Sequence, residues 1–294
     1  STLDRSSAAS DVYKRQGHSI GGSDICRFRA WLIEDERSEA TAAKYTRDIA
    51  AFQAFLGARK ISKELAVAYK EKLRHEYAAV STNSKLAAIN RFLVFKGIPD
   101  CRVKPLRVQR DAYRDPKKEL TKAEYFRLLE AAARKGNRRM EMLLLTLGGT
   151  GVRVSELQYI TAEAVFQGRA VVDMKGKRRT ILIAGGLRKR LLTYMRRTGI
   201  QSGGLFVTRT GRPMDRSNIW KEMKALCAEA QVSAAKVFPH NIRHLFARCY
   251  YKQNRDIAKL ADILGHASIE TTRIYLMESG IQHLKTIEKT GLIA

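Results

Sequence analysis

One stretch near the C-terminus, residues 239–279, limits what this 294-residue chain can fold into more than any other part of it. His240 and Arg243 stand three residues apart there, a spacing that places two side chains on one face of a helix. Pro239 suits the first turn of that helix, because its missing N–H would have no partner there anyway. The apolar residues that follow recur with a helical period as far as Gly265, which fits as a helix stop. The stretch therefore predicts a series of short helices.

The polar groups of this stretch suit chemistry on a phosphodiester. His266 follows the glycine stop, and Ser268 can cap a further helix that carries Tyr275. An arginine offers a planar fork that matches phosphate oxygens, a histidine carries protons near neutral pH, and a tyrosine hydroxyl can act as a covalent nucleophile. Taken singly, each residue is more often packing or a satisfied polar group. In this order and spacing, they predict a site that breaks and joins a phosphate ester.

The charge balance of the chain points to the same kind of partner. Lys and Arg number 55 against 29 Asp and Glu, which gives a formal net charge of +26. A chain this basic favours a polyanion, and nucleic acid before a membrane surface. No stretch approaches the ~18 uninterrupted apolar residues of a transmembrane helix. The four cysteines are scattered without metal-ligand spacing, as free thiols in a reducing cytosol are. We therefore expect a cytoplasmic protein without a membrane partner.

Several segments resemble the signature of the tyrosine recombinases, the phage-integrase and Xer type of enzyme. They are GGTGVRVSEL (148–157), VVDMKGKRRTILI (171–183), HNIRH (240–244), ILGH (263–266) and TTRIYLM (271–277). The resemblance covers about residues 22–294 and is strongest from residue 120 onward. It implies a mainly α fold, in which a four-helix core-binding domain and a mostly helical catalytic domain with a small antiparallel β-sheet form a C-shaped DNA clamp.

The resemblance also implies which residues do the chemistry. Its catalytic set falls here on Arg153, Lys175, His240, Arg243, His266 and, as the nucleophile, Tyr275. Lys175 precedes the glycine of the expected hairpin tip, and Lys177 remains an alternative on the sequence alone. Arg153 comes just after a glycine turn and near a helix start, where unpaired N–H groups favour an anion. We expect Glu156 to brace the active-site arginines.

Three regions follow from the apolar and charged patterns. Residues 20–98 carry four apolar stripes at helical period, the last capped by Ser81, and the resemblance places a SAM-like DNA-binding domain here. Residues 99–119 are basic, contain prolines and lack a period, so they predict a linker. Residues 120–294 are the catalytic domain of the resemblance, and the run 171–183 predicts its β-hairpin.

Local sequence patterns predict individual helices and a strand within residues 120–294. Thr121 and Glu124 form a capping box that opens a helix. We expect a second helix over 153–160 and a short strand over 205–207.

Residues 1–16 need separate treatment. Ser6–Gln16 reads SSAASDVYKRQ, and its back-translation matches a common sequencing-library adaptor. We expect residues 1–16 to be a non-native leader, which leaves any upstream domain open, and exclude them from fold reasoning.

A further set of side chains is expected to contact DNA. For the members in the helical region 20–98 the alternative is a solvated helix face, which is the commoner role of a surface charge, and for those in the linker it is a plain tether. The set comprises Lys44, Tyr45, Arg47, Lys85, Arg91, Lys104, Arg107, Lys177, Arg178 and Arg179.

The preferred function is site-specific DNA recombination through a 3′-phosphotyrosyl intermediate. We expect no cofactor, because the sequence offers neither a carboxylate cluster for a metal nor a phosphate-binding glycine loop. The expected partner is double-stranded DNA with paired inverted repeats, bound by a tetramer that is weakly associated or monomeric without DNA. Alternatives are DNA relaxation of the type IB topoisomerase kind and a non-catalytic DNA-binding regulator. The sequence does not choose between integration or excision of a mobile element, resolution and inversion.

Overall fold

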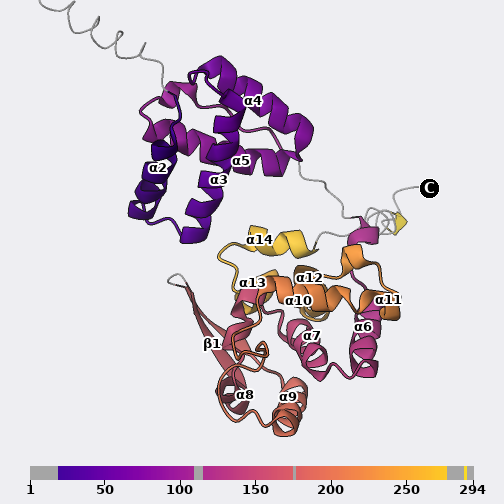
Figure 1. The fold of residues 1–294 in the computed structure, drawn as a ribbon. Coiled ribbons are helices and arrows are strands. Elements are labelled where there is room, and N and C mark those ends of the chain that lie inside the picture. Colours follow the sequence, from indigo (N-terminus) through magenta and orange to yellow (C-terminus); the bar gives the residue numbers. More distant parts are fainter. Residues whose placement is uncertain (1–18, 109–114, 175–176, 277–287, 290–294) are drawn as a thin grey trace, which may run out of the picture. The chain divides into compact units, whose positions relative to one another are not determined.

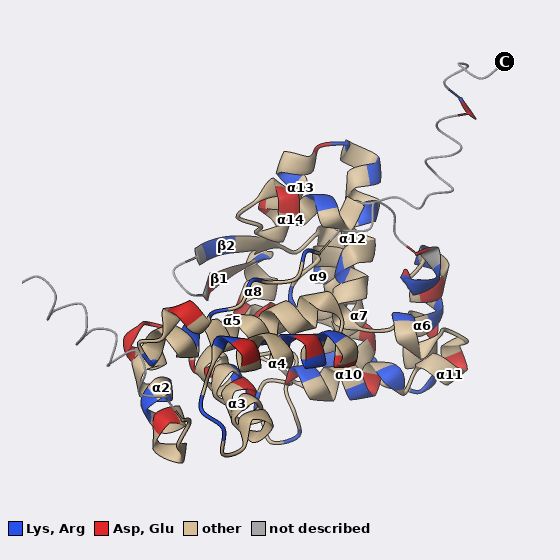
Figure 2. Cartoon of the chain, turned by 90° about the horizontal axis from the view of Figure 1, so that it is seen from above, with Lys and Arg blue, Asp and Glu red and all other residues tan. Residues whose placement is uncertain are grey.

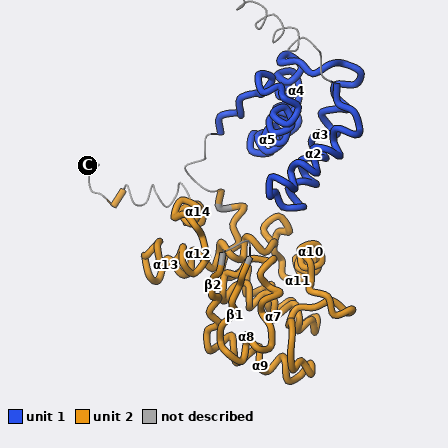
Figure 3. The backbone as a smooth tube through the Cα atoms, turned by 90° about the vertical axis from the view of Figure 1, so that its left-hand side faces the viewer, with its two compact units in different colours: residues 1–110 blue, residues 111–294 orange. Residues whose placement is uncertain are grey.

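The computed structural model describes residues 19–108, 115–174, 177–276 and 288–289, arranged as in Figure 1. The expected leader 1–16 and the tip residue Lys175 lie outside these ranges. The chain divides into two compact units, residues 1–110 and 111–294 (Figure 3), and each is described on its own. Within the described residues, no helix has both the length and the apolar character needed to span a bilayer.

The first unit is a bundle of four helices, as its apolar stripes predicted. Ser38 and Ser62 cap the second and third helices with their hydroxyl groups, whereas Ser81 lies inside the fourth helix and does not cap it. The elements are α2 (Gly22–Glu34), α3 (Glu39–Leu56), α4 (Lys63–Glu76), α5 (Ala79–Phe95) and the 3-10 turn η1 (Pro99–Cys101).

Aromatic side chains fill the centre of this bundle. Phe28 of α2 meets Phe92 of α5 edge to face, with ring centroids 5.1 Å apart. Phe52 of α3 contacts Tyr69 of α4 at 5.0 Å. All four rings are buried, and burying each such side chain stabilises the fold by about 2 kcal/mol.

A strap of extended chain, residues 103–106, is fixed along α5 by two asparagines. The Asn90 side chain donates to the carbonyl of Val103 at 2.8 Å and accepts from its N–H at 2.9 Å. The Asn83 side chain repeats this pattern with Leu106, at 2.9 and 2.7 Å. The start of the region expected as a plain basic linker is therefore an ordered part of the first unit.

The second unit is mostly helical with one two-stranded antiparallel sheet, which confirms the expected fold class. Its elements as far as residue 198 are η2 (Pro116–Lys118), α6 (Lys122–Arg134), α7 (Arg138–Thr150), η3 (Val154–Tyr159), α8 (Ala162–Gln167), β1 (Arg169–Met174), β2 (Lys177–Leu182) and α9 (Gly185–Thr198). The remainder is α10 (Arg216–Lys224), α11 (Cys227–Ala230), η4 (Ala234–Lys236), α12 (Pro239–Asn254), α13 (Ile257–Leu264), α14 (Ile269–Arg273) and η5 (Ile274–Leu276).

Two local predictions in this unit were wrong. Residues 154–159 form a 3-10 turn rather than an α-helix, and within it the Glu156 side chain folds back to accept from the Arg153 N–H. Residues 205–207 form no strand: Val207 makes an isolated bridge with Pro213, and the preceding Gly204 makes another with Thr161.

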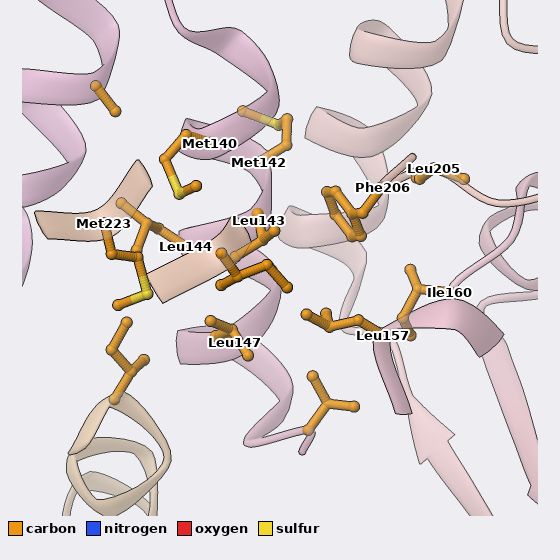
Figure 4. Packing of buried hydrophobic residues seen from close by; sticks show 14 of the residues in the cluster. Met140, Met142, Leu143, Leu144, Leu147, Leu157, Ile160, Leu205, Phe206 and Met223 are labelled. Carbon is orange, nitrogen blue, oxygen red and sulfur yellow. The ribbon is translucent and has the colours of Figure 1, made fainter. Parts of the chain in front are cut away.

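Helix α7 is the central element of the second unit. Met140, Leu143, Leu144 and Leu147 are fully buried and pack as Figure 4 shows. A helix that is apolar on nearly every face must be surrounded by other elements, and α6, α9 and α12 pack against it. Because α7 is held on several sides, the turn at its C-terminal end is a firm base for a site.

The strap generates a testable prediction. Asn90→Ala removes two hydrogen bonds, each worth about 1 kcal/mol, so exchange of the Val103 amide hydrogen should accelerate by about 30-fold. Hydrogen exchange followed by mass spectrometry on the full chain measures this. Lys104→Ala, on the exposed side of the same strap, is the matched control and should leave the exchange rate unchanged. Equal rates in the two variants would contradict the assignment.

Candidate active site

The site begins where α7 ends. Gly151 has a backbone φ of +62°, a left-handed conformation, and a Cβ added there would lie 2.4 Å from the ring of Phe246. The turn therefore requires glycine for its conformation and for its space. It places Arg153 at the start of η3 and directs the carbonyl of Gly151 toward α12.

Arg243 of α12 is the most deeply buried charged group of the site, with 2% of its surface exposed. Its guanidinium donates to the carbonyl of Gly151 at 2.5 Å and to the carbonyl of Leu264, at the end of α13, at 2.7 Å. Burial, with Arg153 nearby, lowers the pKa of Arg243 to about 10, and Tyr275 offsets part of that lowering. Arg243 is therefore charged at neutral pH and ties three helices together.

Arg153 and Glu156 form the second part of the site. The Arg153 guanidinium donates to the Glu156 carboxylate at 2.9 Å and to the carbonyl of Gly265 at 3.1 Å. Its side chain remains 40% exposed, so one side of the guanidinium faces solvent. Burial alone would raise the pKa of Glu156, but hydrogen bonds from Arg179 and Arg153 lower it below its usual range. The carboxylate is therefore ionised and braces Arg153, as expected.

His266 follows the glycine stop of α13 and joins Arg243 to α14. Its Nε2 lies 3.0 Å from Nη2 of Arg243, and its Nδ1 lies 2.8 Å from the hydroxyl of Thr272. Because a guanidinium can only donate, Nε2 accepts, and the ring hydrogen sits on Nδ1 and is donated to Thr272. Burial, together with the charges of Arg243 and Arg153, lowers the pKa of His266 to about 4. The imidazole is therefore neutral at physiological pH.

Tyr275 lies in η5 among the histidines rather than inside α14, where its helix was expected. Its ring stacks on His266 with centroids 5.2 Å apart and planes 11° apart, and it lies 5.5 Å from the ring of His240. The side chain is 6% exposed, and its other neighbours are apolar residues of α12 and α13. The phenol thus belongs to a small apolar cluster between α12 and α13, and it also interacts with the Arg243 guanidinium.

His244 was missed by the sequence analysis although it closes the HNIRH segment. It is buried, its Nε2 lies 3.0 Å from Nε2 of His240, and its ring centroid lies 4.0 Å from that of Tyr275. The spacing of His240 and His244, four residues on a helix, already placed both on one face. That spacing is the signal that could have identified it.

A cleft of about 900 Å³ opens beside these groups. Arg153, His240 and Arg243 lie on one wall. The lining also includes Asp215, Arg216 and Trp220, at and within α10, and Trp220 is half exposed. The cleft gives an extended anionic ligand access to the two active-site guanidiniums.

The predicted DNA contacts fall into two groups. Three of them form ion pairs inside the first unit. Lys44 and Lys85 both pair with Asp48, and Arg91 pairs with Asp35. Arg47, Lys104, Arg107 and Arg178 are exposed, and Tyr45 is half-buried beside the Lys44 ammonium. Lys and Arg occur along helices of both units (Figure 2).

Two members of the hairpin set stand apart from this pattern. Arg179 belongs with the buried site rather than with the surface cations among which it was grouped, because its guanidinium is bonded to Glu156. The side chain of Lys177 lies outside the described part of the chain, as Lys175 does.

Fold and site together define a DNA strand-exchange enzyme architecture, and comparisons with known proteins identify its family. Residues 118–279 match the phage integrase family, and residues 25–97 match the phage integrase N-terminal SAM-like domain. The chain belongs to the phage integrase family, whose members include the tyrosine recombinases.

Relatives and solved structures agree with this assignment. The tyrosine recombinase XerA of Pyrococcus furiosus is 29% identical over 90% of this chain and 93% of its own. The tyrosine recombinase XerC of Roseiflexus castenholzii is 30% identical over 83% of this chain and 85% of its own. The crystal structure of XerA recombinase covers 92% of this chain and 99% of its own, with a TM-score of 0.52 and 25% identity. A lambda integrase dimer bound to a core site covers 91% and 80%, with a TM-score of 0.72 and 16% identity.

The lowered pKa of His266 yields a prediction. In the folded protein the ring should stay neutral from pH 7 down to pH 5, whereas in concentrated urea it should titrate near the ordinary value of about 6.5. Between these two pKa values the unfolded chain binds more protons, so the free energy of unfolding should fall as pH drops through this window. Imidazole NMR, with His266→Gln for assignment, measures the titration. An inflection near pH 6.5 in the folded protein would contradict the geometry.

Proposed function

We propose that this protein, a tyrosine site-specific recombinase, cuts and rejoins DNA with Tyr275 as its nucleophile. One observation carries the proposal. Arg153 and Arg243 come from sequence positions 90 residues apart, yet both guanidiniums bond to the turn at the end of α13, beside the phenol.

The first step is attack of the Tyr275 oxygen on the scissile phosphorus. A bond forms from phosphorus to the phenolic oxygen, and the bond from phosphorus to the 5′-oxygen breaks. A phenol is a weak nucleophile until its proton has an acceptor, and His240 fills that role. Arg153 and Arg243 stabilise the charge that develops on the non-bridging oxygens, and neutral His266, which accepts from Arg243, orients that guanidinium. Lys175 protonates the departing 5′-oxygen, which completes the proton balance.

The product of this step is a 3′-phosphotyrosyl bond and a free 5′-hydroxyl. The covalent link retains the energy of the phosphodiester, so a 5′-hydroxyl from another duplex can reverse the reaction without ATP. The residues named supply the acid, the base and the charge stabilisation, so the mechanism assigns no step to a metal ion.

Recombination requires two DNA sites to be held together. Solved relatives include a lambda integrase tetramer bound to a Holliday junction. We accordingly propose that this chain assembles as a tetramer on paired inverted-repeat sites, in which each core-binding and catalytic unit contacts one half-site as a clamp. Integration or excision of a mobile element and resolution would both use this chemistry. DNA relaxation by a monomer, as in type IB topoisomerases, would use the same chemistry but leave no recombinant product.

Tyr275→Phe tests the nucleophile. This variant should bind a DNA site, selected by it from a random duplex pool, as tightly as the unsubstituted protein, but should form no covalent adduct on a nicked form of that site. Tyr251→Phe removes a hydroxyl from a half-buried neighbour on α12 and should form the adduct normally. Denaturing gel electrophoresis separates adduct from free protein. Normal adduct formation by the Tyr275→Phe variant would refute the assignment.

The proton donor has a separate test. Lys175→Ala should slow cleavage of ordinary DNA by about 100- to 10,000-fold, because a 5′-alkoxide leaves poorly without a proton. A substrate with sulfur at the 5′-bridging position should restore the rate, since a thiolate leaves unaided. Lys177→Ala is the matched control and should be close to normal on both substrates. Rescue of Lys177→Ala instead would move the acid to that lysine.

A further inference from the structure

Arg179 of β2 makes an unusual set of contacts for a basic residue of a hairpin strand. Its Nε donates to Oε1 of Glu156 at 3.1 Å, its Nη2 donates to Oε2 of the same carboxylate, and its Nη1 donates to the carbonyl of Ile263 at 2.8 Å. Only 12% of its side chain is exposed. One guanidinium therefore links the hairpin, the η3 turn and the last turn of α13.

The end of α13 is shaped to admit this side chain. Gly265 has a φ of +62°, and a Cβ added to it would lie 2.3 Å from Cδ and 3.0 Å from Nε of Arg179. A substituent at this position would thus collide with Arg179 and also strain the backbone. Gly265, the helix stop expected from the sequence, therefore also leaves the space that the Arg179 side chain occupies on its way to Glu156.

The position of Arg153 depends on this contact through Glu156. The Glu156 carboxylate accepts from the Arg153 guanidinium and N–H on one side and from Arg179 on the other. The side chain of Glu156 is 5% exposed, so water cannot readily replace Arg179 as a donor. Without Arg179 the buried carboxylate would lose two of its donors and its fixed orientation, and Arg153 would lose its firm support.

We infer that Arg179 is a positioning residue for DNA cleavage, which holds Arg153 and the His266 turn in register with the lysine-bearing hairpin. The inference rests on the function proposed above. It separates Arg179 from its neighbour Arg178, which is exposed on the same strand. Arg178 suits a DNA contact, whereas the guanidinium of Arg179 is already bonded inside the protein.

A DNA-contact role and a positioning role for Arg179 predict different effects of substitution on DNA affinity and on cleavage rate. A residue that only contacts the DNA backbone should weaken binding and reduce its salt dependence. A positioning residue should leave affinity unchanged and slow the chemical step, because misplacing a catalytic group by about 1 Å costs on the order of 100-fold. Lysine cannot replace Arg179, since one ammonium cannot bond both carboxylate oxygens and the Ile263 carbonyl in a fixed fork.

The experiment compares Arg179→Lys and Arg179→Gln with Arg178→Gln in the full chain. Single-turnover cleavage of the nicked selected site should be about 100-fold slower in both Arg179 variants, with unchanged Kd. Arg178→Gln should show the reverse, a higher Kd and a normal rate at saturating protein. Circular dichroism checks folding, and if Arg179→Gln unfolds, the charge-preserving Arg179→Lys decides the outcome.

A second readout separates positioning from general loosening of the fold. The groups that face His266 are Arg243 and His240 from α12, Arg153 from η3, Arg179 from β2, Thr272 from α14 and Tyr275 from η5. Removing the charge at position 179 raises the pKa of His266, so the acid limb of the cleavage-rate profile should move to higher pH in Arg179→Gln. A loss of folded protein would lower the whole profile without moving that limb.

The outcomes are distinguishable from failure of the proposed function. If the unsubstituted protein forms no adduct on any selected site, the proposed function fails and the inference with it. If it forms the adduct and the Arg179 variants cleave at the same rate, only the inference is overturned. Parallel loss of affinity in the Arg179 and Arg178 variants would likewise overturn it in favour of a DNA contact.

Discussion

The site depends on one buried cation, the guanidinium of Arg243. Removing such a charge from water costs several kcal/mol unless the protein supplies partners. The partners here are backbone carbonyls at the C-terminal ends of α7 and α13, where each helix presents partial negative charge. Both helices end in a left-handed glycine, which turns the chain away and leaves these carbonyls accessible. The fold of the second unit thus places two helix ends so that they stabilise one arginine.

The charges of the site are balanced for a reaction that gains negative charge. Arg153 and Arg179 bond to one carboxylate, Glu156, whereas Arg243 bonds to backbone carbonyls. These three guanidiniums and one carboxylate carry an excess of two positive charges. His266 adds none, because it is neutral. A phosphodiester carries one negative charge, and the five-coordinate state during attack carries two on its non-bridging oxygens. The cluster therefore matches the transition state better than the resting ester.

The parts of the fold and site that could be predicted from the sequence are those whose contacting residues lie close together along the chain. The HNIRH spacing placed His240 and Arg243 on one face of a helix, and the capping box at Thr121 and the stop at Gly265 were placed correctly, because each is a local pattern. Periodicity carries no information about which distant backbone atom a side chain meets. Arg179 bonds to a carbonyl 84 residues away, a partner that no local pattern identifies. Strand alternation does place Arg179 on the same face as the buried Ile181, and that signal was not used.

The strap formed by residues 103–106 has a consequence for movement between the two units. The two asparagine side chains attach it to α5, so the chain is bonded to the first unit as far as Leu106. The reach of a connector grows roughly with the square root of its length, and the local concentration of one attached module around another rises as that reach shortens. Two amide side chains on one helix thereby determine where the ordered backbone of the first unit ends.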